Sequence, residues 1–372
     1  MVVVGTRPEV IKMAPVVARL QEQVETVVCA TGQHQEMLTQ ALHTFHLVPH
    51  YRLNAMQPGQ SLNRLASRLM GDIDQVLDQE KPDWVLVQGD TTTALCGALA
   101  AFHKQVPVGH VEAGLRTGKL DSPFPEEANR LMIARIATRH FAPTRTAAEN
   151  LLAEGIEKSR VVVTGNTVVD AIALATLQWK EGRPPHLPEA IQKAVSDKPV
   201  VLVTCHRREN FGEVMEGICH MLKRLCSRYR QFQWIFPVHF NPQVREPVRR
   251  ILGHVDNISL IDPVDYHTNL YLMSKSTLVV SDSGGIQEET PTFFTPIVVM
   301  REHTERAEGI AAGFATLAGQ EAAGIEQAVS LWLDSPERLA SLKQVSNPYG
   351  DGKAALRIVN SLCGREVDVF HG

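Results

Sequence analysis

The segment Trp-Val-Leu-Val-Gln-Gly-Asp-Thr-Thr-Thr-Ala-Leu-Cys-Gly-Ala-Leu-Ala-Ala (84–101) decides the fold class. An apolar run ends at a glycine, a carboxylate follows, and three threonines lead into an alanine-rich stretch. The run is continuously hydrophobic, which is typical of a strand whose two faces are both covered by helices. The segment therefore predicts a strand, a turn and a helix of an α/β protein with a parallel sheet.

Similar short apolar runs recur along the chain and predict further buried strands. They are residues 2–4, 26–30, 106–111, 161–164, 200–204, 234–238, 258–261, 278–281 and 296–300. The series runs once to about residue 165 and restarts near 199, after a stretch that bears prolines and charges. At 372 residues the chain exceeds the size of one hydrophobic core. We therefore expect two doubly wound domains joined around 166–198.

The amino-acid composition argues against several classes of protein. With 37 basic and 41 acidic residues, the formal net charge is −4, so a nucleic-acid partner is not expected. No uncharged stretch reaches the roughly 20 apolar residues of a membrane helix, and the first residues lack the pattern of a signal peptide. The six cysteines never form C-x-x-C, which predicts reduced thiols and no structural zinc. We expect a cytoplasmic protein with no membrane partner.

Polar residues follow the first strand and the strand at 84–88. Arg7 and Lys12 lie where a helix begins after the first strand, an arrangement that suits an anionic ligand but also a capped helix with solvated charges. Asp90 follows the strand 84–88. Taken alone, Asp90 is better explained as a helix N-cap than as a catalytic group.

The next strand end is crowded with titratable side chains. His110 and Glu112 end the strand, Arg116 lies in the loop, and Glu126 follows in Pro-Phe-Pro-Glu-Glu (123–127). The His-x-Glu spacing is shared with zinc deaminases, but their Pro-Cys-x-x-Cys partner motif is missing, so a metal site is not expected. The two glutamates are candidate acid–base groups, and a solvated polar loop remains the alternative.

The second half has two strand ends of interest. His206 follows the strand 200–204, and Ser283-Gly284-Gly285 follows the strand 278–281. Glycines before a helix offer backbone N–H groups for a diphosphate, and Glu289, one turn later, can accept hydrogen bonds from ribose hydroxyls. Neither G-x-G-x-x-G nor the P-loop pattern occurs at these ends, so a dinucleotide cofactor has no support.

Eight motifs together carry a resemblance to a known family. They are Gly-Thr-Arg-Pro-Glu (5–9), Gly-Asp-Thr-Thr-Thr (89–93), His-Val-Glu-Ala-Gly-Leu-Arg-Thr (110–117), Pro-Glu-Glu-Ala-Asn-Arg (125–130), Thr-Gly-Asn-Thr-Val-Val-Asp (164–170), His-Arg-Arg-Glu-Asn (206–210), Asp-Ser-Gly-Gly-Ile-Gln-Glu-Glu (282–289) and Asn-Pro-Tyr-Gly-Asp-Gly (347–352). In this order they resemble the non-hydrolysing bacterial UDP-N-acetylglucosamine 2-epimerases. The similarity is collinear from residue 2 to about residue 360.

The resemblance implies two Rossmann-like domains in a glycosyltransferase-B arrangement with an interdomain cleft for the UDP-sugar. It implies an N-terminal domain of residues 1–166, joined by a C-terminal helix at about 350–372, and a UDP-binding domain of residues 167–349. It further implies a homodimer that interconverts UDP-N-acetylglucosamine and UDP-N-acetylmannosamine for surface polysaccharide synthesis, by elimination and re-addition of UDP, without a cofactor.

The resemblance also implies roles for individual residues. It implies nucleotide and phosphate contacts from Arg7, His206, Ser283, Gly284, Gly285, Glu289 and Arg306. It implies sugar-side and catalytic roles for Lys12, Asp90, Glu112 and Glu126, with His206 stabilising charge on the leaving diphosphate. A second UDP-N-acetylglucosamine binds some bacterial members as an activator, and the residues in the corresponding motifs are Gln33, His34, Arg207, Arg208 and His239.

Several positions depart from the family pattern. Phe293 and Phe294 replace a small, glycine-containing turn, Ala307 replaces a proline, and Cys205 stands where a small residue is common. Asn269 stands where an aromatic residue near the uracil is usual. These changes predict an altered UDP affinity more than an altered reaction. A glycosyltransferase of the same architecture, a hydrolysing epimerase and a catalytically silent UDP-sugar sensor are the alternatives.

Overall fold

The computed structural model describes residues 1–32, 35–57, 59–180, 182–207 and 210–372, and in these the chain forms two compact units. Unit 1 comprises Met1–Ala175 together with Tyr349–Gly372, and unit 2 comprises Thr176–Pro348. The boundary follows helix α7 (Thr167–Ala175), whereas the family resemblance implies a boundary before that helix, at 166/167.

Unit 1 alternates short strands with helices. Its elements are β1 (Val2–Val4), α1 (Arg7–Gln21), β2 (Val28–Ala30), α2 (Gln35–Thr44), β3 (Tyr51–Arg52), α3 (Leu62–Glu80), β4 (Val85–Gln88), α4 (Thr92–His103), β5 (Val108–Val111), α5 (Glu126–Ile136), β6 (Arg139–Ala142), α6 (Arg145–Ala153), η1 (Lys158–Arg160), β7 (Val161–Val163), α7 and α17 (Ala354–Leu362). The described strands form a parallel sheet in the order β3-β2-β1-β4-β5-β6-β7.

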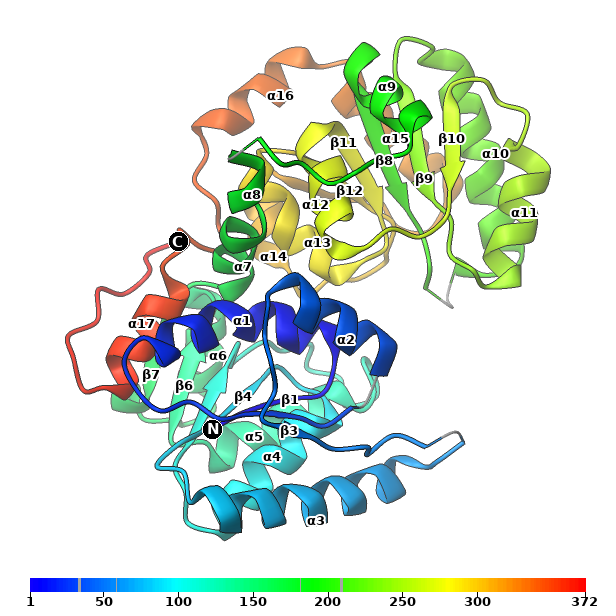
Figure 1. Ribbon diagram of the computed structural model, residues 1–372. Coiled ribbons are helices and arrows are strands. Elements are labelled where there is room, and N and C mark those ends of the chain that lie inside the picture. The colour runs from blue at the N-terminus through cyan, green and yellow to red at the C-terminus, as the bar shows by residue number, and fades with distance from the viewer. Residues whose placement is uncertain (33–34, 58, 181, 208–209) are drawn as a thin grey trace. The chain divides into compact units, whose positions relative to one another are not determined.

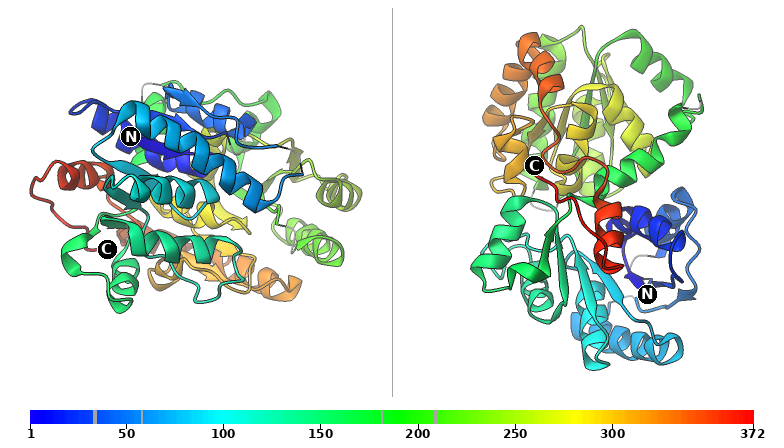
Figure 2. Two further views of the ribbon diagram at one scale, coloured as in Figure 1. Left: turned by 90° about the horizontal axis from the view of Figure 1, so that it is seen from below. Right: turned by 90° about the vertical axis from the view of Figure 1, so that its left-hand side faces the viewer.

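Helices cover both faces of this sheet, as continuous hydrophobicity requires. Figure 1 shows α1 and α2 on one face and α3, α4 and α5 on the other. The C-terminal helix α17 lies beside α1, as Figures 1 and 2 both show. Asp170 of α7 fixes the start of α17, because its carboxylate accepts hydrogen bonds from the backbone N–H groups of Ala354 and Ala355 at 3.2 and 3.0 Å. The C-terminal segment thus completes unit 1.

Unit 2 repeats this plan. Its elements are α8 (Leu177–Lys180), α9 (Glu189–Asp197), β8 (Val200–Thr204), α10 (Glu213–Arg228), β9 (Gln233–Pro237), α11 (Pro242–Leu252), β10 (Ile258–Ile261), α12 (Tyr266–Lys275), β11 (Ser276–Ser281), α13 (Gly284–Glu289), η3 (Thr290–Phe293), β12 (Ile297–Val299), α14 (Ala307–Ala311), β13 (Ala315–Leu317), α15 (Ala322–Leu333), α16 (Pro336–Ser341) and η4 (Leu342–Gln344). The described strands form a parallel sheet in the order β10-β9-β8-β11-β12-β13.

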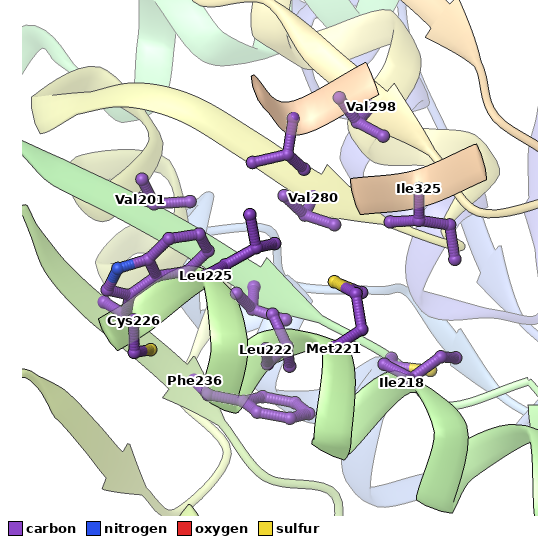
Figure 3. Packing of buried hydrophobic residues seen from close by; sticks show 14 of the residues in the cluster. Val201, Ile218, Met221, Leu222, Leu225, Cys226, Phe236, Val280, Val298 and Ile325 are labelled. Atoms are coloured by element: carbon purple, nitrogen blue, oxygen red, sulfur yellow. The ribbon is translucent and has the colours of Figure 1, made fainter. Parts of the chain in front are cut away.

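One hydrophobic core of unit 2 lies between one face of this sheet and helices α10, α11 and α15. Figure 3 shows side chains of α10, among them Leu222 and Leu225, packed against Phe236 of β9 and Val280 of β11. These side chains are fully buried, and burying a side chain of this size contributes about 1.5–3 kcal/mol to folding. The strand ends of β8 and β11 are held together by their pairing in the sheet, where Thr204 lies opposite Ser281.

The predicted α/β class is confirmed, and every predicted strand has a counterpart in the structure. Three strands were missed: β3, β6 and β13. Strand β6 reads Arg-His-Phe-Ala, and its polar start hides it from a search for apolar runs, although His140 is completely buried. Strands β3 and β13 are only two and three residues long and lie at sheet edges, so they carry little pattern.

Two further expectations concern the whole chain. All six cysteines are free thiols, and five of them are buried while Cys363 is half-buried. In the part of the chain that the structure describes, no helix is both long and apolar enough to cross a membrane.

Candidate active site

The polar strand ends of unit 1 meet at one edge of its sheet. Strand β1 neighbours β4, and β4 neighbours β5, so the loops after these three strands are adjacent. The chain order reverses between β1 and β4, and doubly wound sheets bind ligands at such a switch point. Lys12, Asp90 and Glu112 come from these loops and the helices that follow them.

Lys12 and Glu112 form an ion pair through Lys12 Nζ and Glu112 Oε2. Only 9% and 8% of their side-chain surfaces are exposed, so the two charges interact in a poorly solvated environment. Glu112 also has a left-handed backbone conformation, with φ of 64°, which costs a non-glycine residue about 1–2 kcal/mol. Strained backbone of this kind concentrates at functional sites, where surrounding contacts maintain it.

Asp90 is held by helix α5. Arg130 donates from an NH2 nitrogen to Asp90 Oδ2 at 2.5 Å, and Asn129 Nδ2 donates to the Asp90 carbonyl oxygen at 2.8 Å. The preceding turn is fixed as well, because His110 Nε2 donates to the Gly89 carbonyl oxygen at 2.7 Å. Burial lowers the pKa of His110 to about 4, so the imidazole is neutral at pH 7. Glu126 begins the same helix α5 and is partly exposed.

Glu9 joins the loop after β1 to the loop after β4. Its carboxyl group accepts hydrogen bonds from Gly5 N at 3.0 Å, Thr6 Oγ1 at 2.7 Å and Thr91 Oγ1 at 2.8 Å. Burial raises the pKa of Glu9 to about 7, although these hydrogen bonds act in the opposite direction. The loop that contains Arg7, which is exposed at the start of α1, is therefore tied to the turn that contains Asp90.

In unit 2 one buried carboxylate organises the loop after β8. Asp282 is fully buried, and its Oδ2 accepts hydrogen bonds from the backbone N–H groups of His206 and Arg207 and from Asn210 Nδ2, each at 2.9 Å. His206 Nδ1 lies 3.3 Å from Asp282 Oδ1. The imidazole is 47% exposed, so it is oriented by a carboxylate and still accessible to a ligand.

The Ser-Gly-Gly turn lies at the neighbouring strand end, since β11 pairs with β8 at the switch point of this sheet. Ser283 precedes α13, and Gly284 and Gly285 form its first turn. A β-carbon at Gly285 would meet no atom within 4 Å, whereas one at Gly284 would meet the Arg306 guanidinium at 3.2 Å. The turn thus presents backbone N–H groups at a helix start, which favours an anion.

Arg306 is itself part of an acidic–basic cluster. Its Nε donates to Glu288 Oε1 at 3.0 Å, and an NH1 nitrogen pairs with Glu305. Burial alone would raise the pKa of Glu305, but the charges of Arg306 and Arg301 lower it to about 2. Glu289, at the end of α13, is 7% exposed.

Residues that differ from the family pattern near the predicted uracil loop include one that packs against aromatic side chains of unit 2. Phe293 stacks on Trp179 with ring centroids 6.4 Å apart, and Trp179 Nε1 donates to His267 Nε2 at 2.6 Å. Asn269 lies in α12 and is partly buried, while Phe294 is 45% exposed with φ of 55°. Phe293 therefore helps to build an aromatic cluster in unit 2 instead of a glycine turn.

Comparison with known proteins shows similarity to one family over almost the whole chain. The family model described as UDP-N-acetylglucosamine 2-epimerase matches residues 18–363. The chain is 46% identical over 371 residues to the UDP-N-acetylglucosamine 2-epimerase of Escherichia coli K12, a match that covers 99% of each protein. The chain belongs to the UDP-N-acetylglucosamine 2-epimerase family.

Solved structures of this family agree with the fold. The crystal structure of UDP-GlcNAc 2-epimerase from Neisseria meningitidis bound to UDP-GlcNAc superposes with a TM-score of 0.88, at 43% identity, over 98% of this chain and 99% of that one. The S. aureus MnaA–UDP co-structure gives a TM-score of 0.90, at 43% identity, over 100% and 99% of the two chains.

The structure brings some of the residues that the resemblance named into direct contact. In this member of the UDP-N-acetylglucosamine 2-epimerase family Lys12 pairs with Glu112, and the rings of His206 and His239 lie 6.3 Å apart. Arg306 lies against Gly284. Of the residues considered for an activator site, Gln33, His34 and Arg208 lie outside the described residues.

Sequence reasoning missed the residues that hold the site residues in place. They are Glu9, Asn129, Arg130 and Asp282. A signal existed for Glu9, because Thr6 and Glu9 have the spacing of a capping box. The other three lie inside quoted family motifs, but nothing local reveals that their partners come from other strand ends. Among the residues described here, no group of three or more His, Cys, Asp and Glu side chains is arranged to hold a metal ion.

Proposed function

We propose that this chain catalyses the reversible epimerisation of UDP-N-acetylglucosamine at C2, which yields UDP-N-acetylmannosamine. The observation that carries the proposal is the pair of fixed carboxylates, Asp90 and Glu112, at the switch point of unit 1. They occur in a chain that matches enzymes of this name over almost its whole length.

The reaction needs two proton-transfer groups because C2 is not adjacent to a carbonyl and its hydrogen is not acidic. A base takes the C2 proton, the electron pair of the C–H bond forms the C1=C2 double bond, and the C1–O bond breaks to release UDP. Re-addition of UDP to 2-acetamidoglucal, with a proton delivered to the other face of C2, gives the epimer. Asp90, Glu112 and Glu126 are the groups we assign to these transfers.

The leaving diphosphate needs stabilisation of its negative charge. In unit 2 the N–H groups of Gly284 and Gly285 and the imidazole of His206 supply donors at neighbouring strand ends. The N–H group of Ser283 donates to Ser281 Oγ at 3.0 Å, so we assign the Ser283 contact to its hydroxyl group. In unit 1 we assign Arg7 to the same task. Glu289 and Arg306 complete the nucleotide contacts of the proposal.

The direct test is to incubate the pure protein with UDP-N-acetylglucosamine, without added NAD or metal, and to follow the anomeric proton signals by NMR. A second UDP-sugar signal with deuterium at C2, when the solvent is D₂O, is the expected result. Free N-acetylmannosamine with UDP would instead identify a hydrolysing enzyme, and transfer to an acceptor would identify a glycosyltransferase. UDP-sugar binding without any product would identify a sensor.

The proposal also covers the oligomeric state of the protein, its activation by a second ligand and its location in the cell. We infer a cytoplasmic homodimer that makes a surface polysaccharide precursor, because the resemblance implies these properties. We also infer that a second UDP-N-acetylglucosamine activates the enzyme, and the proximity of His239 to His206 supports a neighbouring site. Light scattering tests the dimer. A velocity that rises sigmoidally with UDP-N-acetylglucosamine tests the activator.

A further inference from the structure

Helix α5 connects two of the loops that carry the candidate carboxylates. Asn129 and Arg130 bind Asp90 in the loop after β4. Glu127 accepts hydrogen bonds from the backbone N–H groups of Thr117 and Gly118, at 3.0–3.1 Å, in the loop after β5. One helix therefore determines the positions of both loops, and its first residue is Glu126.

Arg130 differs from Asp90 in its access to solvent. The Arg130 side chain is 5% exposed, and the Asp90 side chain is 26% exposed. Asp90 can thus be reached from outside, whereas Arg130 lies behind it. An Arg130 NH1 nitrogen is also 3.4 Å from Glu127 Oε2, so the guanidinium is fixed from two sides.

This geometry limits what Arg130 can do. A buried cation that donates to Asp90 Oδ2 forms a charge-assisted hydrogen bond, which restricts the carboxylate to one rotamer. A carboxylate that transfers protons to or from C2 gains from this restriction, because misplacement of about 1 Å can reduce a rate about 100-fold. The alternative is that Arg130 merely neutralises the buried Glu127.

We propose that Arg130 is a positioning residue for epimerisation, which acts through Asp90 and not on the substrate. The proposal rests on the proposed function, since it assigns a role within that reaction. It predicts that the effect of losing Arg130 depends on the presence of the Asp90 carboxylate.

A double-mutant cycle tests this dependence. We expect Arg130→Met to lower kcat about 10- to 100-fold while KM changes less than about threefold, because the group acts on the transition state. In an Asp90→Asn background the same change should lower kcat less than about threefold further. Arg130→Lys, which keeps the charge, should recover part of the loss. Equal losses in both backgrounds, or a changed KM with an unchanged kcat, would overturn the proposal.

A matched control and a milder variant keep the test decisive. Arg135→Met removes an exposed arginine of the same helix, whose guanidinium contacts the Glu154 carbonyl oxygen, and should leave kcat unchanged. If Arg130→Met fails to fold, Arg130→Lys replaces it in the same cycle, with about a 3- to 10-fold loss of kcat that Asp90→Asn abolishes. An additive loss there refutes the proposal. A wild-type protein that does not epimerise refutes the proposed function instead.

Discussion

The candidate carboxylates of unit 1 and the imidazole of unit 2 are held in different ways. In unit 1, ion pairs between side chains hold the functional groups, as Lys12 holds Glu112 and Arg130 holds Asp90. In unit 2, the buried Asp282 binds backbone N–H groups and leaves His206 half exposed. The first arrangement fixes particular carboxylates, and the second fixes the course of a loop.

The difference matches the chemistry proposed for each unit. A proton-transfer group must be held in one rotamer close to the reacting carbon, which favours buried ion pairs around it. A phosphate is bound by several N–H donors, so a correctly shaped loop with open glycines is sufficient. If this division is correct, changes in unit 1 reduce turnover and changes in unit 2 reduce UDP binding.

The largest effect is expected at the carboxylates of unit 1. Glu112→Gln should lower kcat by about 100-fold or more, the loss typical for removal of a positioned acid or base, while UDP affinity remains within about twofold. Steady-state kinetics and a calorimetric UDP titration measure the two quantities. Glu22→Gln, at an exposed ion pair of α1, is the control and should change neither. Near-normal turnover in Glu112→Gln would show that Glu112 is a charged loop residue without a catalytic role.

In unit 2 the corresponding change is Asp282→Ala. It leaves the N–H groups of His206 and Arg207 without their carboxylate, so we expect about 2 kcal/mol less stability in urea unfolding. UDP should also bind about tenfold more weakly, because a flexible loop must be ordered on binding. Glu326→Ala, which removes a carboxylate paired with Arg224 elsewhere in unit 2, is the control. Normal UDP affinity with a reduced kcat would reverse the proposed division between the units.

The stability of unit 1 should fall in acid because of its buried His140. Burial lowers the pKa of His140 to about 3 from an ordinary value of 6.5, so the unfolded chain binds this proton first as the pH falls. The contribution of neutral His140 to the free energy of unfolding is therefore complete above pH 6.5 and decreases as the pH falls toward 3. Burial raises the pKa values of Glu9 and Asp170 to about 7 and about 6, so the folded chain binds their protons more readily than the unfolded chain. These two groups stabilise the protein as the pH falls, and the effect of His140 is therefore measured by comparing a His140 variant with wild type.

The measurement is the free energy of unfolding of wild type and His140→Gln at pH 7.5 and pH 5.5. We expect the variant to lose about 1 kcal/mol less than wild type between these values, since one linked proton contributes about 1.4 kcal/mol per pH unit at most. His220→Gln, at an exposed position of α10, should behave like wild type. Equal pH dependence in all three proteins would contradict the buried neutral state of His140.

The smallest effect on UDP binding is expected at Asn269. If this residue lies beside the uracil, Asn269→Phe should tighten UDP binding by about 0.5–1.5 kcal/mol, the additional value of an aromatic contact. A calorimetric titration measures the change, and turnover should stay constant. Unchanged or weaker binding, together with a marked loss of affinity in a folded Tyr266→Ala variant, would show that another residue of the loop holds the base.

Local patterns in the sequence determined the α/β class and the positions of the catalytic candidates. Continuous apolar runs that end in glycine and a polar residue are sufficient to place Asp90 and Glu112 at strand ends, because parallel strands align those ends at one edge. The same logic identified Ser283-Gly284-Gly285. It failed for β6, whose arginine and histidine resemble a loop until burial is known.

Only the tertiary structure decided which partner holds each of these residues. Lys12 and Glu112 are 100 residues apart, His206 and Asp282 are 76 apart, and Asp90 and Arg130 are 40 apart. Such pairs form because the order of strands in the sheet brings distant loops together, and strand order is set by packing of the whole unit. Charge state and accessibility follow from the same packing, so the local sequence at each position cannot specify them.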